Sequence, residues 1–284
     1  MLMTKAYAKI NIGLNILGKD ENDGYHQVDM VTLPLELHDR IEIEILPYGF
    51  DTLITCDDRE IPTDETNIVS KVEKALREKY QYKDKFRIHI HKIIPIGAGL
   101  GGGSADGAAV LLGINKLLKL KLSIEELCEI GKKVGSDIPC CLQNIAARIE
   151  GKGEIITPIK RKKPFGVLIL FPKKSLSTKE VYQKYDQIGS SSQADIEGII
   201  ESLEKDNLEK LYSSMGNQLE DAAKAIYPQL SEMKKVILNQ GFDNVLMTGS
   251  GSAIFTLSRD KKLLKKAYAN LREKGYFVLL TKTK

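Results

Sequence analysis

Alternating apolar and polar residues predict strands along the first part of the chain. Isoleucine alternates with glutamate over residues 41–45, and apolar residues alternate with arginine and histidine over 86–91. This two-residue period is typical of a half-buried strand. Looser alternation predicts further strands over residues 4–17, 27–37, 40–46 and 53–56. A polar turn over residues 20–24 separates the first two of these strands.

Apolar residues at helical spacing predict helices between and after the strands. One helix covers residues 67–80 and another covers 104–118. Candidate caps for the first are Asp64, Thr66 and Asn67. Ser123 and Glu126 form a capping box that opens a third helix. The same reasoning predicts later helices over residues 196–203, 208–215, 219–240 and 261–274, and later strands over residues 166–171, 245–247, 253–257 and 276–281.

This order of elements favours the α+β class. Strands come first, helices follow, and then strands and helices mix, which suits antiparallel or mixed sheets better than a doubly wound parallel sheet. The 284 residues fit one large domain or two of ordinary size. We predict an N-terminal domain over residues 1–160 and a C-terminal domain over residues 161–284.

Composition narrows the class of protein. With 42% hydrophobic and 28% charged residues, the chain has the make-up of a globular protein. No run reaches the roughly 18–20 apolar residues of a membrane helix, and the N-terminus lacks the features of a signal peptide. We therefore expect a cytoplasmic protein with no membrane partner. The four cysteines form no C-x-x-C pair, so we expect reduced, buried thiols rather than a disulfide framework or a zinc site.

The charge of the chain argues against a nucleic-acid partner. Lysine and arginine number 42 against 38 acidic residues, a net charge of +4. The basic residues are also scattered, whereas nucleic-acid binders concentrate them on one face. We interpret them as a solvated surface.

A glycine-rich stretch over residues 95–105 holds the strongest indication of chemistry. Five glycines fall within residues 97–103, between a predicted strand and a predicted helix. Glycines let the backbone approach a ligand and point N–H groups at it, and the helix N-terminus adds partial positive charge. Together these predict a phosphate site. Its residues are Pro95, Ile96, Gly97, Ala98, Gly99, Leu100, Gly101, Gly102, Gly103, Ser104 and Ala105.

The better-known phosphate loops do not match this stretch. No lysine precedes Ser104, as a Walker motif requires, and the G-x-G-x-x-G match alone is weak. A dinucleotide-binding unit needs a strand ending in an acidic residue about 20 residues later, where a helix end is predicted here. The protein-kinase motifs His-Arg-Asp and Asp-Phe-Gly are absent. A purely structural glycine turn remains the alternative.

Two motifs resemble those of the GHMP kinase superfamily, which includes galactokinase, homoserine kinase and mevalonate kinase. The stretch over residues 95–105 fits the superfamily pattern Pro-x-x-x-Gly-Leu-x-x-x-Ser-[Ser/Ala]. Residues 248–253, Thr-Gly-Ser-Gly-Ser-Ala, resemble its third, glycine-rich motif. The resemblance implies a two-lobed GHMP kinase fold, with a ribosomal S5 domain 2-like N-terminal domain and a ferredoxin-like C-terminal domain.

Further segments narrow the resemblance to the 4-diphosphocytidyl-2-C-methyl-D-erythritol kinase family. They lie at residues 6–15, 23–26, 135–139, 151–154 and 177–182. The early turn, however, is one residue longer than the Lys-Arg-Pro-Asp-Gly-Tyr-His common in that family and lacks its arginine. The resemblance implies phosphorylation of the 2-hydroxyl of cytidine-diphosphate methylerythritol, with ATP and Mg²⁺, in the non-mevalonate isoprenoid pathway. The protein would be a monomer or a weak homodimer.

The resemblance also implies the catalytic residues. Asp137 matches the catalytic aspartate, Lys9 its partner and Asn11 a neighbouring polar contact, while Asn67 matches an adenosine contact. A carboxylate can accept the proton of an attacking alcohol, and a nearby lysine keeps it ionised. Judged without the family, Asp137 could equally cap a helix, and Lys9 could be a surface residue.

The residues that match the substrate site are aromatic and polar. Tyr25 and Tyr182 match side chains that sandwich the cytosine, His26 matches the group that hydrogen-bonds it, and Lys152 matches a contact at the cytidine end. Two tyrosines can stack on a base, and a neutral histidine both donates and accepts hydrogen bonds. Taken alone, Tyr25 could be a turn aromatic and Tyr182 a core residue, and Tyr185 is a rival for its role.

Other interpretations compete with this one. Another GHMP kinase, such as a homoserine or mevalonate kinase, would not need the Asp-Gly-Tyr-His turn. A non-catalytic nucleotide- or RNA-binding protein is a more distant alternative. His89 and His91 share a strand face and suggest a metal site, but the sequence shows no clear third ligand, so we interpret them as solvent-facing.

Overall fold

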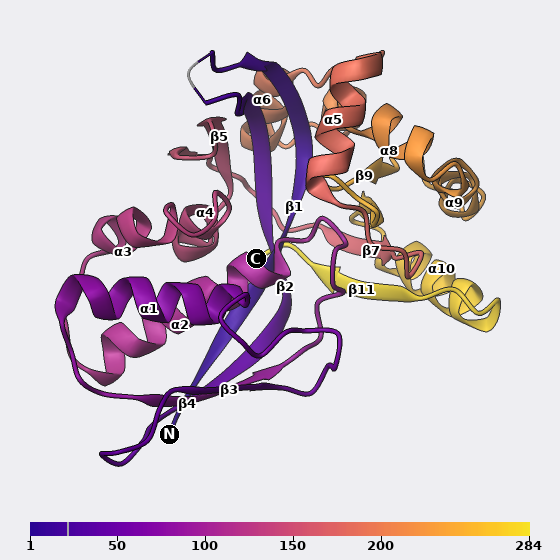
Figure 1. The fold of residues 1–284 in the computed structure, drawn as a ribbon. Helices are drawn as coiled ribbons and strands as arrows, with labels where there is room; N and C mark the ends of the chain where they lie inside the picture. Colours follow the sequence, from indigo (N-terminus) through magenta and orange to yellow (C-terminus); the bar gives the residue numbers. More distant parts are fainter. Residues whose placement is uncertain (22) are drawn as a thin grey trace. The chain divides into compact units, whose positions relative to one another are not determined.

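The computed structural model describes residues 1–21 and 23–284 and confirms the α+β prediction (Figure 1). The predicted turn over residues 20–24 includes Asn22, which lies outside the described residues. The chain divides into two compact units that interleave along the sequence. Unit 1 consists of Met1–Ala8, Leu37–Ile94 and Gly101–Asn144, and unit 2 consists of Lys9–Glu36, Pro95–Leu100 and Ile145–Lys284.

Two long strands explain why the units interleave. Strands β1 (Leu2–Lys19) and β2 (His26–Ile45) each contribute residues to both units. The two strands predicted over residues 27–37 and 40–46 are thus one continuous strand. The domain boundary predicted at residue 160 divides the chain differently from these units, and it stays a prediction.

Unit 1 combines a small mixed sheet with four helices. Strand β4 (Phe86–His91) pairs in parallel with β3 (Leu53–Cys56) and antiparallel with residues 40–45 of β2. The helices, which pack on one another beside these strands (Figure 1), are α1 (Ile68–Tyr80), α2 (Gly102–Leu117), α3 (Ile124–Gly131) and α4 (Ile138–Gln143). Apolar side chains from the strands and helices form one buried cluster.

Local capping explains where the helices of unit 1 begin. Asn67 is the cap of α1, since its side chain accepts a hydrogen bond from the Val69 N–H. The capping box predicted for α3 is confirmed. Helix α2 starts two residues earlier than predicted, because Gly101 adopts a left-handed conformation (φ 71°) that turns the loop directly into the helix.

The small sheet of unit 1 is one part of a seven-stranded sheet, and the part of it in unit 2 is built around the first two strands. Its order is β6 (Ile155–Pro158), β5 (Ala147–Gly151), β2, β1 and β8 (Gly216–Asn217). Residues 28–32 of β2 pair antiparallel with β5, and Gly13 and Leu14 of β1 pair in parallel with β8.

The second sheet of unit 2 has the predicted ferredoxin-like topology. Its order is β11 (Val278–Lys282), β7 (Gly166–Leu170), β10 (Ile254–Ser258) and β9 (Leu246–Met247), with antiparallel pairing throughout. Counted along the chain, the strands lie in the order fourth, first, third, second, which is a split βαβ arrangement. Helix α10 (Lys261–Glu273) connects β10 to β11.

The other helices of unit 2 follow β7 in the chain. They are α5 (Thr178–Ile188), α6 (Ile196–Lys205), α7 (Leu208–Ser214), α8 (Glu220–Ile226) and α9 (Gln229–Leu238). The single helix predicted over residues 219–240 is wrong. The chain leaves helical geometry at Tyr227, because the next residue, Pro228, disfavours it there.

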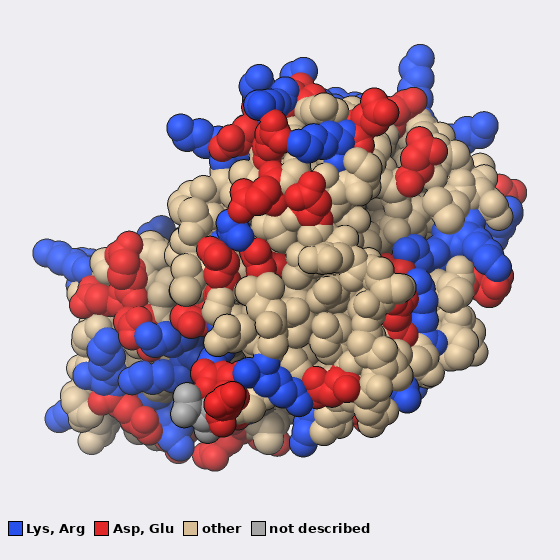
Figure 2. Space-filling view, turned by 90° about the horizontal axis from the view of Figure 1, so that it is seen from above, with Lys and Arg blue, Asp and Glu red and all other residues tan. Residues whose placement is uncertain are grey.

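The face shown in Figure 2 matches the dispersed charge of the sequence. On the face in Figure 2, lysine and arginine lie beside aspartate and glutamate, and neither sign gathers into one large patch. None of the described helices is long and apolar enough to cross a membrane. The four cysteines form no disulfide among the described residues; Cys140 is buried and the others are half-buried.

Candidate active site

Three segments far apart in the sequence meet within unit 2. The Asn11 N–H donates to the Thr248 Oγ1 (3.1 Å), and that hydroxyl donates to the Gly99 carbonyl (3.2 Å). The Lys9 N–H donates to the Leu100 carbonyl (3.0 Å). Through Gly99 and Leu100, the glycine loop therefore contacts both the candidate catalytic strand β1 and the second glycine motif.

Glycine is required where the two glycine motifs touch. Gly99 has φ 76°, and a Cβ there would overlap the Thr248 carbonyl oxygen. Across the contact, a Cβ on Gly249 (φ 56°) would lie 3.0 Å from the Gly99 carbonyl oxygen. The close approach of the two backbones thus depends on both glycines.

Lys9 is a buried residue, not a surface one. Only 8% of it is exposed, and its Nζ donates to the Asn11 Oδ1 at 2.6 Å. The Asn11 Nδ2 in turn donates to the Thr32 Oγ1 (3.0 Å). The amide of Asn11 is therefore held from β2 and orients the ammonium group of Lys9, so the surface interpretation of Lys9 is wrong.

A second cluster surrounds His26, also within unit 2. The His26 Nε2 lies 2.7 Å from the Asp186 Oδ1, and the Tyr182 ring lies 4.7 Å from the His26 ring. The Tyr185 ring is farther away, at 6.4 Å and edge-on. Lys19 pairs with the other oxygen of Asp186 at 2.6 Å. Partial burial alone would raise the pKa of Asp186, but the hydrogen bonds from Lys19 and His26 lower it, so the carboxylate stays charged.

Sequence reasoning missed Asp186. It lies four residues after Tyr182, on the same face of α5, so helical spacing from that tyrosine was the available signal. The partner of His26 therefore comes from the helix that also presents the candidate stacking tyrosine.

Tyr25 lies in the turn next to His26, and Lys152 contacts this turn from the loop between β5 and β6. Tyr25 is 67% exposed, which is unusual for so large an apolar ring. The Lys152 Nζ reaches Asp20 (2.7 Å) and Asp23 (2.5 Å). These hydrogen bonds, first to Asp20 and then to Asp23, raise the pKa of Lys152, so it stays a cation. Lys152 thus braces the turn that presents Tyr25, and its role at the cytidine end stays a prediction.

Residues 95–98 of the glycine loop belong to unit 2, whereas residues 101–105, Asp137 and Asn67 belong to unit 1. Ser104 is in the first turn of α2. Asp137 occupies the cap position of α4, but its side chain does not accept the cap hydrogen bond, which weakens the alternative that it merely caps a helix. Asn67 is 7% exposed, and its Nδ2 donates to the Pro62 carbonyl (2.5 Å). Asn67 therefore has a structural role, and its contact with adenosine stays a prediction.

Unit 1 also contains a buried ion cluster that the sequence did not reveal. The Lys92 Nζ lies 2.6 Å from the Asp39 Oδ2 and 2.7 Å from the Asp106 Oδ2. The second oxygen of Asp106 has no hydrogen-bond partner among the described residues. Burial raises the pKa of Asp106 to about 7, although the attraction of Lys92 opposes the shift.

The raised pKa of Asp106 predicts a pH-dependent stability. Its folded-state pKa of about 7 lies above the unfolded value of about 3.9, so its stabilising contribution is present below pH 4 and is lost as the pH rises through 7. We expect Asp106→Asn to become more stable than the wild type as the pH rises, by on the order of 1–3 kcal/mol. Urea unfolding at pH 4.5, 6 and 8 measures this, with the exposed Glu78→Gln as control; a difference that does not change with pH would contradict it.

Comparison with known proteins identifies the class of protein to which this chain belongs. The family model described as "GHMP kinases N terminal domain" matches residues 67–152, and "GHMP kinases C terminal" matches residues 199–276. The crystal structure of a homoserine kinase from Cytophaga hutchinsonii is 17% identical, covers 99% of this chain and 94% of that chain, and has a TM-score of 0.71, so it shares the fold. The predicted GHMP kinase fold is confirmed.

Relatives with higher sequence identity define the family within this class. The 4-diphosphocytidyl-2-C-methyl-D-erythritol kinase of Geobacillus thermodenitrificans is 38% identical over 95% of this chain and 93% of its own length. That of Clostridium perfringens is 37% identical over 98% and 97%. A crystal structure of 4-(cytidine 5'-diphospho)-2C-methyl-D-erythritol kinase covers 99% of both chains at 28% identity, with a TM-score of 0.82.

This chain therefore belongs to the 4-diphosphocytidyl-2-C-methyl-D-erythritol kinase family of the GHMP kinases. The predictions that it is an enzyme, a kinase, and that ATP is its phosphoryl donor are confirmed with the family. The roles of individual residues stay predictions.

Proposed function

We propose that this kinase transfers the γ-phosphoryl group of ATP to the 2-hydroxyl of 4-diphosphocytidyl-2-C-methyl-D-erythritol, a step of isoprenoid precursor synthesis. The observation that carries the proposal is the cluster around His26, because it offers an aromatic ring, an exposed tyrosine and a polar contact suited to cytosine. The substrate named for the family's relatives supports the same choice. A homoserine or mevalonate kinase has no use for such a cluster.

The hydrogen bond to Asp186 suits His26 to reading cytosine. A carboxylate only accepts hydrogen bonds, so it favours the form of His26 that carries a proton on Nε2. The Nδ1 of the neutral ring is then an acceptor, which matches the exocyclic amino group of cytosine, a donor. Tyr182 lies beside His26 and Tyr25 is exposed next to it, so both rings are suited to stack on the base.

The glycine loop is suited to the phosphates of ATP. Its left-handed glycines, Gly97, Gly99 and Gly101, alternate along the loop, which lets the backbone approach a ligand closely. The hydroxyl of Ser104 at the start of α2 suits Mg²⁺, which prefers oxygen ligands and keeps several waters. Bound there, Mg²⁺ would neutralise charge on the phosphates.

In the proposal, Asp137 is the general base and Lys9 supplies positive charge. The carboxylate of Asp137 accepts the proton of the 2-hydroxyl, which lets that oxygen attack the γ-phosphorus. Lys9, oriented by Asn11, supplies positive charge to the negative charge that develops on the transferred group. Phosphoryl transfer has a loose transition state, so we expect positioning and charge neutralisation to contribute more than the base.

A substrate panel tests the proposal. Purified protein with Mg-ATP is offered the cytidylylated erythritol, mevalonate, homoserine and galactose. We expect phosphorylation of the first only, and phosphorylation of only a non-cytidine substrate would refute the proposal. In the same assay His26→Ala should raise KM for the cytidylylated substrate about tenfold or more, through the lost hydrogen bonds, while KM for ATP stays unchanged. His38→Ala serves as the control, and equal effects on both KM values would contradict the role of His26.

A further inference from the structure

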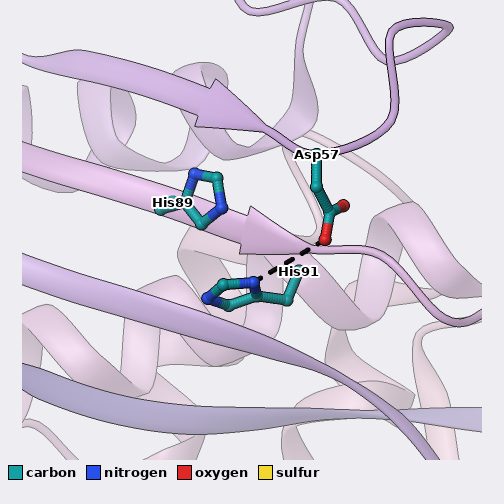
Figure 3. Close-up of side chains that lie close together, drawn as sticks. All are labelled: Asp57, His89 and His91. Atoms are coloured by element: carbon teal, nitrogen blue, oxygen red, sulfur yellow. Dashed lines mark ion pairs between the residues drawn. The ribbon is translucent and has the colours of Figure 1, made fainter.

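Two histidines and an aspartate converge on one face of unit 1, at the edge of its sheet. They are Asp57, His89 and His91 (Figure 3), and one ligand atom from each lies within 4.8 Å of the others. The two histidines are half-buried and the aspartate is exposed. None of the three has a part in the proposed kinase reaction.

The strand register brings these residues together. His89 and His91 are two residues apart on β4, so their side chains point to the same face. Strand β3 runs parallel to β4 with Cys56 opposite Ile90, which places Asp57, the next residue, beside His91. The third ligand that the sequence did not show is therefore supplied by the neighbouring strand.

Hydrogen bonds already orient all three side chains. The His91 Nε2 lies 3.0 Å from the Glu42 Oε1, and the His89 Nδ1 lies 2.7 Å from the Thr55 Oγ1. The Asp57 Oδ1 accepts a hydrogen bond from the Lys92 N–H (2.8 Å), and its Oδ2 lies 3.6 Å from the His91 Nδ1. Each ligand thus uses one polar atom for a supporting contact, as the histidines of metal sites do with their second nitrogen.

We propose that Asp57, His89 and His91 form a binding site for a divalent transition metal such as Zn²⁺. Two imidazoles and one carboxylate suit zinc, whereas Mg²⁺ prefers oxygen ligands, so the site differs in chemistry from a nucleotide-bound magnesium. With zinc bonds of about 2.0–2.2 Å, tetrahedral ligand atoms lie about 3.3–3.6 Å apart. The 3.6 Å between His91 and Asp57 matches, and small side-chain rotations would bring in His89.

A metal at this position would join two strands. Strand β3 has four residues and lies at the end of the strand order in its sheet, next to β4. Bound zinc would link the residue after β3 to two residues of β4, with a water in the fourth position. The metal would stabilise the folded state because the unfolded chain does not bring the ligands together.

Zinc binding to the full-length protein without nucleotide tests the site. Competition with a chromogenic chelator gives the Kd for Zn²⁺, and Co²⁺ in place of zinc gives a visible spectrum that reports the ligand geometry. We expect His89→Ala and Asp57→Asn each to weaken binding at least tenfold, and Glu42→Gln to weaken it about tenfold through loss of the supporting contact. Arg87→Ala is the matched control, since Arg87 lies on the same face of β4 and pairs with Glu44.

Thermal melts give a second measure of zinc binding. Zn²⁺ at about 100 times the wild-type Kd should raise the Tm of the wild type and of Arg87→Ala by about 5–10 °C, and that of His89→Ala by about half as much or less. Kinase activity with Mg-ATP confirms that each variant is folded. Zinc affinities that are equal in His89→Ala, Asp57→Asn and Arg87→Ala, or the absence of measurable binding to the wild type, would overturn the proposal.

Discussion

Replacing Asp137 by alanine is expected to lower kcat by about 10²- to 10⁴-fold, the range typical of a lost general base. Nucleotide affinity should change little, because the proposed role of Asp137 lies with the acceptor alcohol and not with ATP. Steady-state kinetics give kcat, and a separate binding titration gives the affinity for ATP.

The same variant separates catalysis from helix capping. If Asp137 merely capped α4, Asp137→Ala would lose about 0.5–2 kcal/mol of stability and keep its turnover. Because the side chain does not accept the cap hydrogen bond, we do not expect the loss of stability that removal of a cap would cause. Asp137→Asn keeps the size of the side chain and removes its basicity, so it should be as inactive as the alanine variant. Turnover within threefold of the wild type in both would refute the assignment.

Replacing Gly99 by alanine is expected to raise KM for ATP and to lower the stability of the protein. The Cβ of Gly99→Ala would overlap the Thr248 carbonyl oxygen and lie 3.0 Å from the Gly251 nitrogen, and both of these are backbone atoms that cannot turn aside. The left-handed φ of 76° adds about 1–2 kcal/mol for a residue with a side chain. We expect the two glycine motifs to be forced apart, with KM for ATP raised at least tenfold and Tm lowered by several degrees.

Gly49→Ala controls for the backbone conformation alone. Gly49 also has a left-handed φ, 96°, but nothing lies within 4 Å of the added Cβ. It should therefore show only the conformational cost and leave KM for ATP unchanged. If Gly99→Ala behaved like Gly49→Ala, the contact between the two motifs would not matter for nucleotide binding.

Much of the fold was predictable because its strands and helices carry strong local patterns. The alternation of isoleucine and glutamate predicts β2, and the capping box predicts the start of α3. Neither prediction requires knowledge of the tertiary contacts. Elements without such a pattern were missed. Helix α5 has one buried residue, Val181, and therefore no apolar stripe, and α4 is a six-residue helix with Pro139 in its first turn. Strands β5 and β6 were also missed, and the sequence of β6, Ile-Ile-Thr-Pro, does not alternate.

The candidate active site likewise contains residues that the sequence revealed and residues that it did not. Its glycine motifs, Lys9 and the Tyr25–His26 pair have sequence patterns that a known family shares. The groups that support them come from distant segments and leave no local pattern: Asp186 lies beside His26, and Thr32 lies beside Asn11. Such partners follow from strand register and helix packing, which the sequence alone does not reveal.

The bond from Asn11 to Thr248 has a consequence for the order in which the enzyme is made. The hydroxyl that receives the Asn11 N–H is synthesised 237 residues after Asn11 itself. Through Asn11, the position of Lys9 likewise depends on a residue that is synthesised much later. Contacts of such long separation form late and slowly. A nascent chain therefore lacks a finished catalytic strand until Thr248 has been synthesised.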